Sequence, residues 1–194
     1  MTAVGKKATL RGIKDAKFAV LSTDNTSATT YGTLYDIPDV ASIPLTFKVE
    51  ADKQKGDGRI TDIYAEIQEA EGKMTFGRVC MDVLSLITGG SITASGITPN
   101  QKQTLKLGNT ILPYFKLEGQ CKYVGTNGDT SVTTPADAHF LIKKGKITSD
   151  LEVNFTNDGF ANISFGFTAI QTVYGGDTSE IVNIVFNETS TAIT

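Results

Sequence analysis

The 194-residue sequence contains no tryptophan, a single histidine and only two cysteines. One histidine, His139, cannot supply a metal site built from several imidazoles. Cys80 and Cys121 are far apart and form no C-x-x-C pattern, so we interpret them as two buried free thiols, with a disulfide as the alternative. No apolar run approaches the 18 residues of a membrane-spanning helix, and residues 1–21 are too basic and too short of apolar residues for a secretory signal.

Charge of one sign is not in excess either. The chain has 18 Lys and Arg against 21 Asp and Glu, for a formal net charge of −3. A dedicated nucleic-acid-binding protein is therefore not expected, because such proteins carry a basic surplus. No P-loop, GxGxxG or GxSxG motif occurs, and residues 52–66 lack the glycine that an EF-hand loop needs. These absences predict a protein that is not an enzyme and that uses no cofactor and no metal.

A few reactive or charged side chains still call for a functional hypothesis. A Cys–His pair is conceivable, and Cys80 is the better nucleophile candidate because it lies at a predicted helix start, where thiol pKa values fall. We nevertheless interpret His139 as a structural or surface residue. Lys143, Lys144 and Lys146 are interpreted as a solvated turn, with a phosphate contact as the alternative.

The residues that are abundant favour β-structure. Thr, Ile, Val, Phe and Tyr together make up 72 of the 194 residues, and these types suit a pleated, half-buried surface. Apolar and polar residues alternate over residues 115–123 and 163–169, which predicts strands with one face in the core. Further strands are predicted over the segments 16–22, 40–50, 60–68, 74–77, 138–142, 151–155 and 180–186.

One helix is predicted over residues 79–88, where Val79, Val83, Leu86 and Ile87 share a face and Gly89 follows as a stop. Pro44 predicts an edge position or a bulge, and Asp158-Gly159 predicts a hairpin turn. We expect a single mainly β domain, a β-sandwich or barrel with this one short helix. An N-terminal arm (1–11), a charged loop (48–59) and a C-terminal tail (178–194) are expected as assembly extensions.

The segment 48–59 is dense in charge and nearly free of apolar residues, which predicts a solvated loop or the tip of a long hairpin. Long polar connections in a protein without an active site are interpreted as contacts with another subunit. We predict contacts between subunits or rings at seven side chains: Lys48, Glu50, Asp52, Lys53, Lys55, Asp57 and Arg59. A mobile surface loop is the alternative.

Several segments resemble the major tail proteins, or tail tube proteins, of long-tailed bacteriophages of the non-contractile siphovirus type. Residues 12–21 (GIKDAKFAVL) with Tyr31-Gly32 are similar to the first strand and turn of that family. Residues 82–90 (DVLSLITGG) are similar to its short helix. Pro113-Tyr114-Phe115, the strand that follows and Asp158-Gly159 resemble its C-terminal half.

The resemblance implies a structural virion protein that assembles in the host bacterial cytoplasm. Six copies would close into a ring, and rings would stack into a hollow tail tube that delivers double-stranded DNA without sequence-specific binding. The implied partners are other copies of the chain, the tape measure, the tail terminator and the tail tip. We expect a neutral or acidic lumen, because a basic wall would retain DNA phosphates.

Two alternatives stay open. One is a head–tail connector or another virion ring protein, which would form a single closed ring. The other is a carbohydrate-binding β-sandwich module, in which Tyr31, Tyr35 and Tyr64 would replace the missing tryptophans as an aromatic platform.

Overall fold

The computed structural model describes residues 8–125, 137–155, 161–174, 180–187 and 192–193. The prediction of a mainly β protein with one short helix is confirmed. The strands run in this order: β1 (Ala8–Asp24), β2 (Thr29–Tyr31), β3 (Tyr35–Asp36), β4 (Val40–Ser42), β5 (Leu45–Gly56), β6 (Arg59–Phe76), β7 (Ser91–Ser95), β8 (Lys102–Lys106), β9 (Phe115–Gly125), β10 (Asp137–Asn154), β11 (Asn162–Ala169) and β12 (Val182–Phe186). The helix α1 (Met81–Thr88) lies between β6 and β7.

Ten strands form one antiparallel sheet with the path β2-β1-β9-β10-β11-β6-β4, and β7 and β8 form a separate two-stranded sheet. The large sheet curls until its ends approach each other. β3 pairs with β1 at one end and β4 pairs with β6 at the other, so the short segment 35–42 bridges them. Among the described strands this bridge does not complete a closed barrel.

Aromatic side chains fill the space inside the curl. Phe18, Phe115, Phe165 and Phe167 are almost completely buried, and Phe115 lies with its ring centroid 4.8 Å from Phe18 and 5.7 Å from Phe167. The predicted inward positions are confirmed at Phe115 and Leu117 of β9 and at Ile163, Phe165, Phe167 and Ala169 of β11, although Ser164 is buried as well. Gln120, expected to face outward, is buried and donates to Asp137 at 2.6 Å.

Helix α1 closes one end of this core with the buried side chains of Val83, Leu84 and Ile87. It begins two residues later than predicted, because Cys80 is extended and acts as its N-cap. Val79 is therefore exposed rather than buried. Gly89 ends the helix in the left-handed region (φ +66°), as the sequence predicted, where a side chain would be strained.

Three boundaries differ from the sequence predictions. The segment 40–50 is divided at Pro44 into β4 and β5, because proline cannot donate to the ladder. The segments 60–68 and 74–77 are one continuous strand, β6. The lysines at 143–146 lie inside β10 at a register shift between Ile142 and Gly145, not in a turn.

Other predictions lie partly outside the described residues. β10 pairs with β11 as the predicted hairpin requires, and its innermost described pair is Asn154 with Asn162, but the turn itself is not described. Residues 8–11 of the predicted N-terminal arm belong to β1, and residues 182–186 of the predicted tail form β12. The hairpin of β7 and β8 was not predicted at all.

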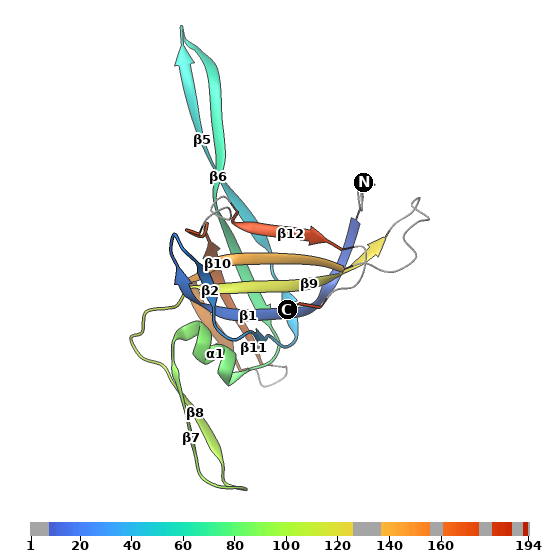
Figure 1. Ribbon diagram of the computed structural model, residues 1–194, viewed down its shortest axis with the longest axis vertical. Helices are drawn as coiled ribbons and strands as arrows, with labels where there is room; N and C mark the ends of the chain where they lie inside the picture. Colours follow the sequence, from blue (N-terminus) through green and yellow to red (C-terminus); the bar gives the residue numbers. More distant parts are fainter. Residues whose placement is uncertain (1–7, 126–136, 156–160, 175–179, 188–191, 194) are drawn as a thin grey trace.

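Two hairpins project from opposite ends of the body along the longest axis of the molecule (Figure 1). One consists of the outer parts of β5 and β6, and we call its residues 48–69 the long arm. The other consists of β7 and β8, and we call its residues 91–106 the short hairpin.

Candidate functional site

The long arm contains the seven charged residues predicted as assembly contacts. The structure selects the hairpin over the loop for this segment, because β5 and β6 stay paired from Leu45–Gly72 to Gly56–Arg59. The strands are joined by Asp57 and Gly58, both with positive φ (+50° and +75°), which is the backbone of a two-residue hairpin turn. The Asp-Gly pair is a sequence signal for this turn that our sequence interpretation missed.

Antiparallel pairs place their two side chains on the same face of a ribbon, and successive pairs alternate between faces. The core face of the body continues into the arm, from Leu45–Gly72 and Phe47–Ala70 outward. Gln68 is an extra residue of β6 without a partner in β5, a β-bulge. The next pair on this face is therefore Val49–Ile67. Two more pairs follow on the same face: Ala51–Ala65 and Lys53–Ile63.

This face of the arm is apolar and uncovered. Val49, Ile63 and Ile67 are 60%, 56% and 49% exposed. The eight residues of β5 beyond Lys48 extend about 26 Å at 3.3 Å per residue, well past the body. A run of exposed apolar side chains on a two-stranded ribbon indicates a surface that another protein covers. We call this surface the apolar face of the arm.

The opposite face carries the acids. The pairs Lys48–Glu69, Glu50–Glu66, Asp52–Tyr64 and Gln54–Asp62 alternate with the apolar pairs, so five carboxylates and one lysine share this side. Glu66 accepts hydrogen bonds from the Tyr64 hydroxyl and from the Gln68 side chain, which confirms that these three residues lie on one face. The bond to Glu66 also raises the pKa of the Tyr64 hydroxyl. We call this surface the acidic face of the arm.

The structure distributes the seven predicted residues unevenly. Glu50 and Asp52 lie on the acidic face, Lys53 lies on the apolar face, and Asp57 is in the turn. Near the tip of the arm, Lys55 pairs with Ile60, and Arg59 pairs with Gly56. Lys48 forms an ion pair with Glu71 at 2.9 Å, and this hydrogen bond raises the pKa of Lys48. Their role in assembly stays a prediction.

Asp62, Glu66 and the apolar side chains were missed as site residues. The apolar residues Ile63, Ala65 and Ile67 were assigned to the core because they alternate with polar residues. Alternation shows that a ribbon has two different faces, but it does not show what covers the apolar one.

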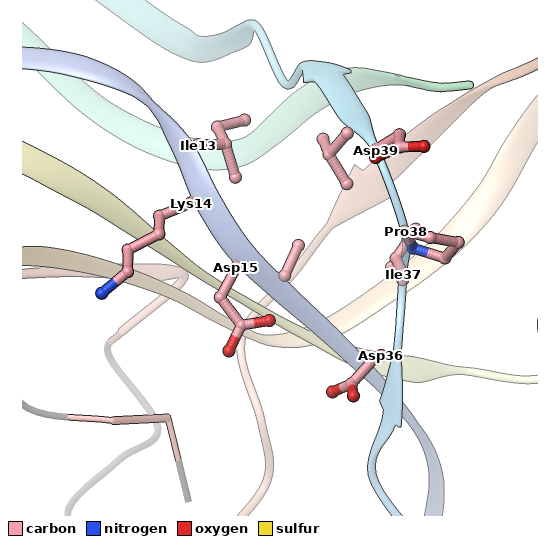
Figure 2. A pocket seen from close by; sticks show the side chains of 9 residues that line it. Ile13, Lys14, Asp15, Asp36, Ile37, Pro38 and Asp39 are labelled. Atoms are coloured by element: carbon pink, nitrogen blue, oxygen red, sulfur yellow. The ribbon is translucent and has the colours of Figure 1, made fainter. Parts of the chain in front are cut away.

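A hollow of about 480 Å³ lies on the body, between β1 and the segment 36–40. Figure 2 shows the carboxylates of Asp15, Asp36 and Asp39 spread around it rather than converging on one point. Asp39 pairs with Arg78 at 2.6 Å, and Asp36 lies 3.8 Å from Lys17. No cluster of three metal-ligating side chains occurs among the described residues.

The structure excludes one of the two possible Cys–His pairs, the one with Cys121. His139 pairs with Gln120 and Cys121 with Ala138, so His139 and Cys121 lie on opposite faces of the sheet and form no Cys–His pair. The described cysteines are free and half-buried, rather than fully buried, and burial raises the pKa of the Cys121 thiol. Cys80 packs against the edge of the core.

The lysines of β10 are engaged within the protein. Lys144 pairs with Asp24 at 2.5 Å, Lys143 pairs with Glu180 at 2.8 Å, and Lys146 lies 4.8 Å from the centre of the Tyr114 ring. These contacts favour a structural role over a phosphate site.

The three tyrosines suggested as a carbohydrate platform do not share a surface. Tyr31 is in β2 and donates to the carbonyl of Lys143 at 3.0 Å. Tyr35 is in β3 against β1, whereas Tyr64 lies on the long arm. No helix in the described part of the chain is long and apolar enough to cross a membrane.

With this geometry in place, comparisons with known proteins add no assignment. No protein-family model matches the chain, and no curated protein matches it at a significant level.

Proposed function

We propose that this protein is a self-assembling structural subunit, and specifically a tail tube protein of the siphovirus type. The observation that carries the proposal is the apolar face of the arm, which extends the core face of the main sheet beyond the body and is covered by none of the described residues. A second copy of the chain is the proposed cover, because rings of identical subunits present such an arm to the same neighbouring surface around the whole ring.

Three further features support the tail-tube assignment. The segments 12–32, 82–90 and 113–123, on which the resemblance rests, form β1 with β2, the helix α1 and the start of β9. The curled sheet with one helix is compatible with the sandwich or barrel of that family. The two hairpins project from opposite ends, as stacking of rings requires (Figure 1).

In this proposal six copies form a ring and the rings stack into a tube through which double-stranded DNA passes. The tube would begin at the tail tip, follow the tape measure and end at the terminator. A connector would form one closed ring, and the second projecting hairpin favours the tube over it. The distribution of Tyr31, Tyr35 and Tyr64 disfavours the carbohydrate-binding module.

Electron microscopy of the negatively stained protein across a concentration series tests the proposal. Rings or hollow tubes of uniform width are the expected result. Monomers at every concentration, also after seeding with tail tips, would refute self-assembly, and glycan screening would then address the binding-module alternative.

A triple substitution tests the role of the arm. Val49→Thr, Ile63→Thr and Ile67→Thr retain β-branched side chains but lose apolar surface. Each side chain is about half exposed, so covering it stabilises assembly by about 1 kcal/mol, and all three by about 3 kcal/mol per arm. The association constant of ring formation should fall more than about 100-fold.

The matched control changes three threonines that lie elsewhere on exposed strand surface, Thr30→Ser, Thr46→Ser and Thr148→Ser. Both proteins should unfold at nearly the wild-type temperature, since all the substituted side chains are exposed. Wild-type assembly by the arm variant, measured by sedimentation velocity, would contradict the proposed role of the apolar face.

A further inference from the structure

The short hairpin has a face whose chemistry is opposite to that of the acidic face of the arm. Its pairs Ser91–Lys106, Thr93–Thr104 and Ser95–Lys102 share one side of the ribbon. All six side chains are exposed. The face therefore presents two ammonium groups and four hydroxyl groups. We call it the lysine face of the short hairpin.

Carboxylates are missing from this region. The sequence from Gly89 to Tyr114 contains no Asp or Glu, and Lys102 and Lys106 are its only charged residues. Neither lysine forms an ion pair with a carboxylate of the described residues. Thr93 donates to the carbonyl of Thr104 at 3.4 Å, but the charge of the two lysines is not balanced by a carboxylate of the described residues.

The acidic face of the arm has the complementary surplus. Glu50 lies directly opposite Glu66, and Asp52 and Asp62 follow on the same side. Like charges placed opposite each other destabilise a strand pair. A cationic partner would convert this repulsion into attraction, and serine and threonine hydroxyls would donate to the remaining carboxylate oxygens.

The two faces cannot meet within one subunit, because the arm and the short hairpin project from opposite ends of the body (Figure 1). We propose that the acidic face of the arm of one copy binds the lysine face of the short hairpin of a second copy, and that this contact joins successive rings. The contact is heterologous, since it uses two different surfaces, and a heterologous contact repeats head to tail into an open stack.

The inference rests on the proposed function, because it requires rings of this subunit that stack. It assigns the two faces of the arm to different contacts. The apolar face holds neighbours within a ring, whereas the acidic face holds the next ring. The two contacts should respond differently to salt. Screening lengths shorten from about 10 Å at 0.1 M to about 3 Å at 1 M salt, so stacks should separate into rings at 1 M salt while the rings persist.

Charge reversal on each side gives the decisive test. An arm variant carries Glu50→Lys, Asp52→Lys and Asp62→Lys, and a hairpin variant carries Lys102→Glu and Lys106→Glu. In the arm variant both faces are basic, and in the hairpin variant both are acidic. Each variant alone should form rings but stack at least about tenfold more weakly than wild type.

Mixing separately formed rings of the two variants should restore stacking. A basic arm then faces an acidic hairpin, and an acidic arm faces a basic hairpin, so the two kinds of ring alternate. Negative-stain images and sedimentation velocity report stack length. The control is Lys14→Glu with Lys73→Glu, which reverses two exposed lysines on the body and should leave stacking as in wild type.

The outcomes separate this inference from the proposed function. Stacks in either variant alone, at wild-type strength, would overturn the arm–hairpin contact while leaving ring formation intact. Rings that fail to stack after mixing would also overturn it. Failure of the wild-type protein to form rings would refute the proposed function, and this contact with it.

Discussion

Substitution of Gly72 by alanine should destabilise the core far more than its size suggests. Gly72 in β6 lies directly opposite Phe167 in β11. A Cβ atom at position 72 would be 2.3 Å from Cζ of Phe167 and 2.8 Å from each Cε atom. The ring cannot easily move aside, because it is 1% exposed and its centroid lies 5.7 Å from that of Phe115.

The expected cost follows from this overlap. Forcing an extra carbon into a well-packed core costs about 1–3 kcal/mol, and the fully buried ring places Gly72→Ala near the upper end. For a chain of this size about 1 kcal/mol corresponds to about 2–4 °C, so the melting temperature should fall by about 6–12 °C. The assay is thermal and urea-induced unfolding followed by circular dichroism.

Gly108→Ala is the matched control, because a Cβ atom there meets no atom within 4 Å. It should change the free energy of unfolding by about 0.5 kcal/mol or less. Combining Gly72→Ala with Phe167→Leu should cost less than the sum of the single substitutions by more than about 1 kcal/mol. Additive costs, or equal effects of the two alanines, would refute the steric explanation.

Three further predictions concern other contacts. Burial opposes ionisation of Asp24, but hydrogen bonds from Lys144 (2.5 Å) and from a backbone N–H outweigh it and lower the pKa of Asp24 below 3.8. The ionised Asp24 therefore stabilises the folded state above about pH 3.8, and this stabilisation is lost as the pH falls below that value. Asp24→Asn should lower the free energy of unfolding by about 1.5–3 kcal/mol at pH 7 and weaken the dependence of unfolding on acidic pH. An unchanged acid-unfolding profile in this variant would contradict the prediction. Burial raises the pKa of the Cys121 thiol above 9.0. Alkylation of this thiol should therefore be slow at pH 7 and accelerate above about pH 9, because the thiolate is the reactive form. Mass spectrometry measures the extent of alkylation. Asn25 accepts hydrogen bonds from two backbone N–H groups of its turn at 2.9 and 3.0 Å. Asn25→Ala should lower the free energy of unfolding in urea by about 1 kcal/mol. An unchanged free energy of unfolding would show that the turn forms without these hydrogen bonds.

The sequence predicts the parts of the fold in which a face is buried by the chain itself. The apolar positions of β9 and β11 alternate because one side packs in the aromatic core, although Gln120 and Ser164 on the other side are buried as well. The helix is predicted because apolar residues recur on one side, of which Val83 and Ile87 are buried, and because Gly89 ends it. In these elements the local pattern and the tertiary environment agree.

The predictions that failed concern residues whose environment is set at a distance. Lys143, Lys144 and Gly145 look like a turn, but partners from other strands, such as Asp24 for Lys144, keep them within β10. The short hairpin was missed because its exposed face is wholly polar and its alternation is weak. Its strands are held by the ladder between β7 and β8 and by the contact of Leu105 with the core.

The candidate site lies on a segment that the sequence analysis singled out, but its role in contacts stays a prediction and its two-faced form was not predicted. The charge of the segment 48–59 indicated a contact region, whereas the division into an apolar and an acidic face depends on the register between β5 and β6. That register depends on the bulge at Gln68, which leaves Val49 opposite Ile67. The bulge shifts the apolar positions of β6 from odd (Ile63, Ala65, Ile67) to even (Ala70, Met74, Phe76), and this change of phase made one strand look like two.

The continuity of β6 also has a mechanical consequence. This strand runs without interruption from the tip of the arm to Phe76, and its last seven residues pair with β11. Tension applied to an arm held by a neighbouring subunit would therefore act along the strand, at right angles to the hydrogen bonds of an antiparallel ladder. Such bonds are loaded in shear and must yield together rather than one after another. A subunit built in this way would transmit longitudinal force from its contacts directly into its most tightly packed layer, and would resist extension better than a body joined to its arm by a loop.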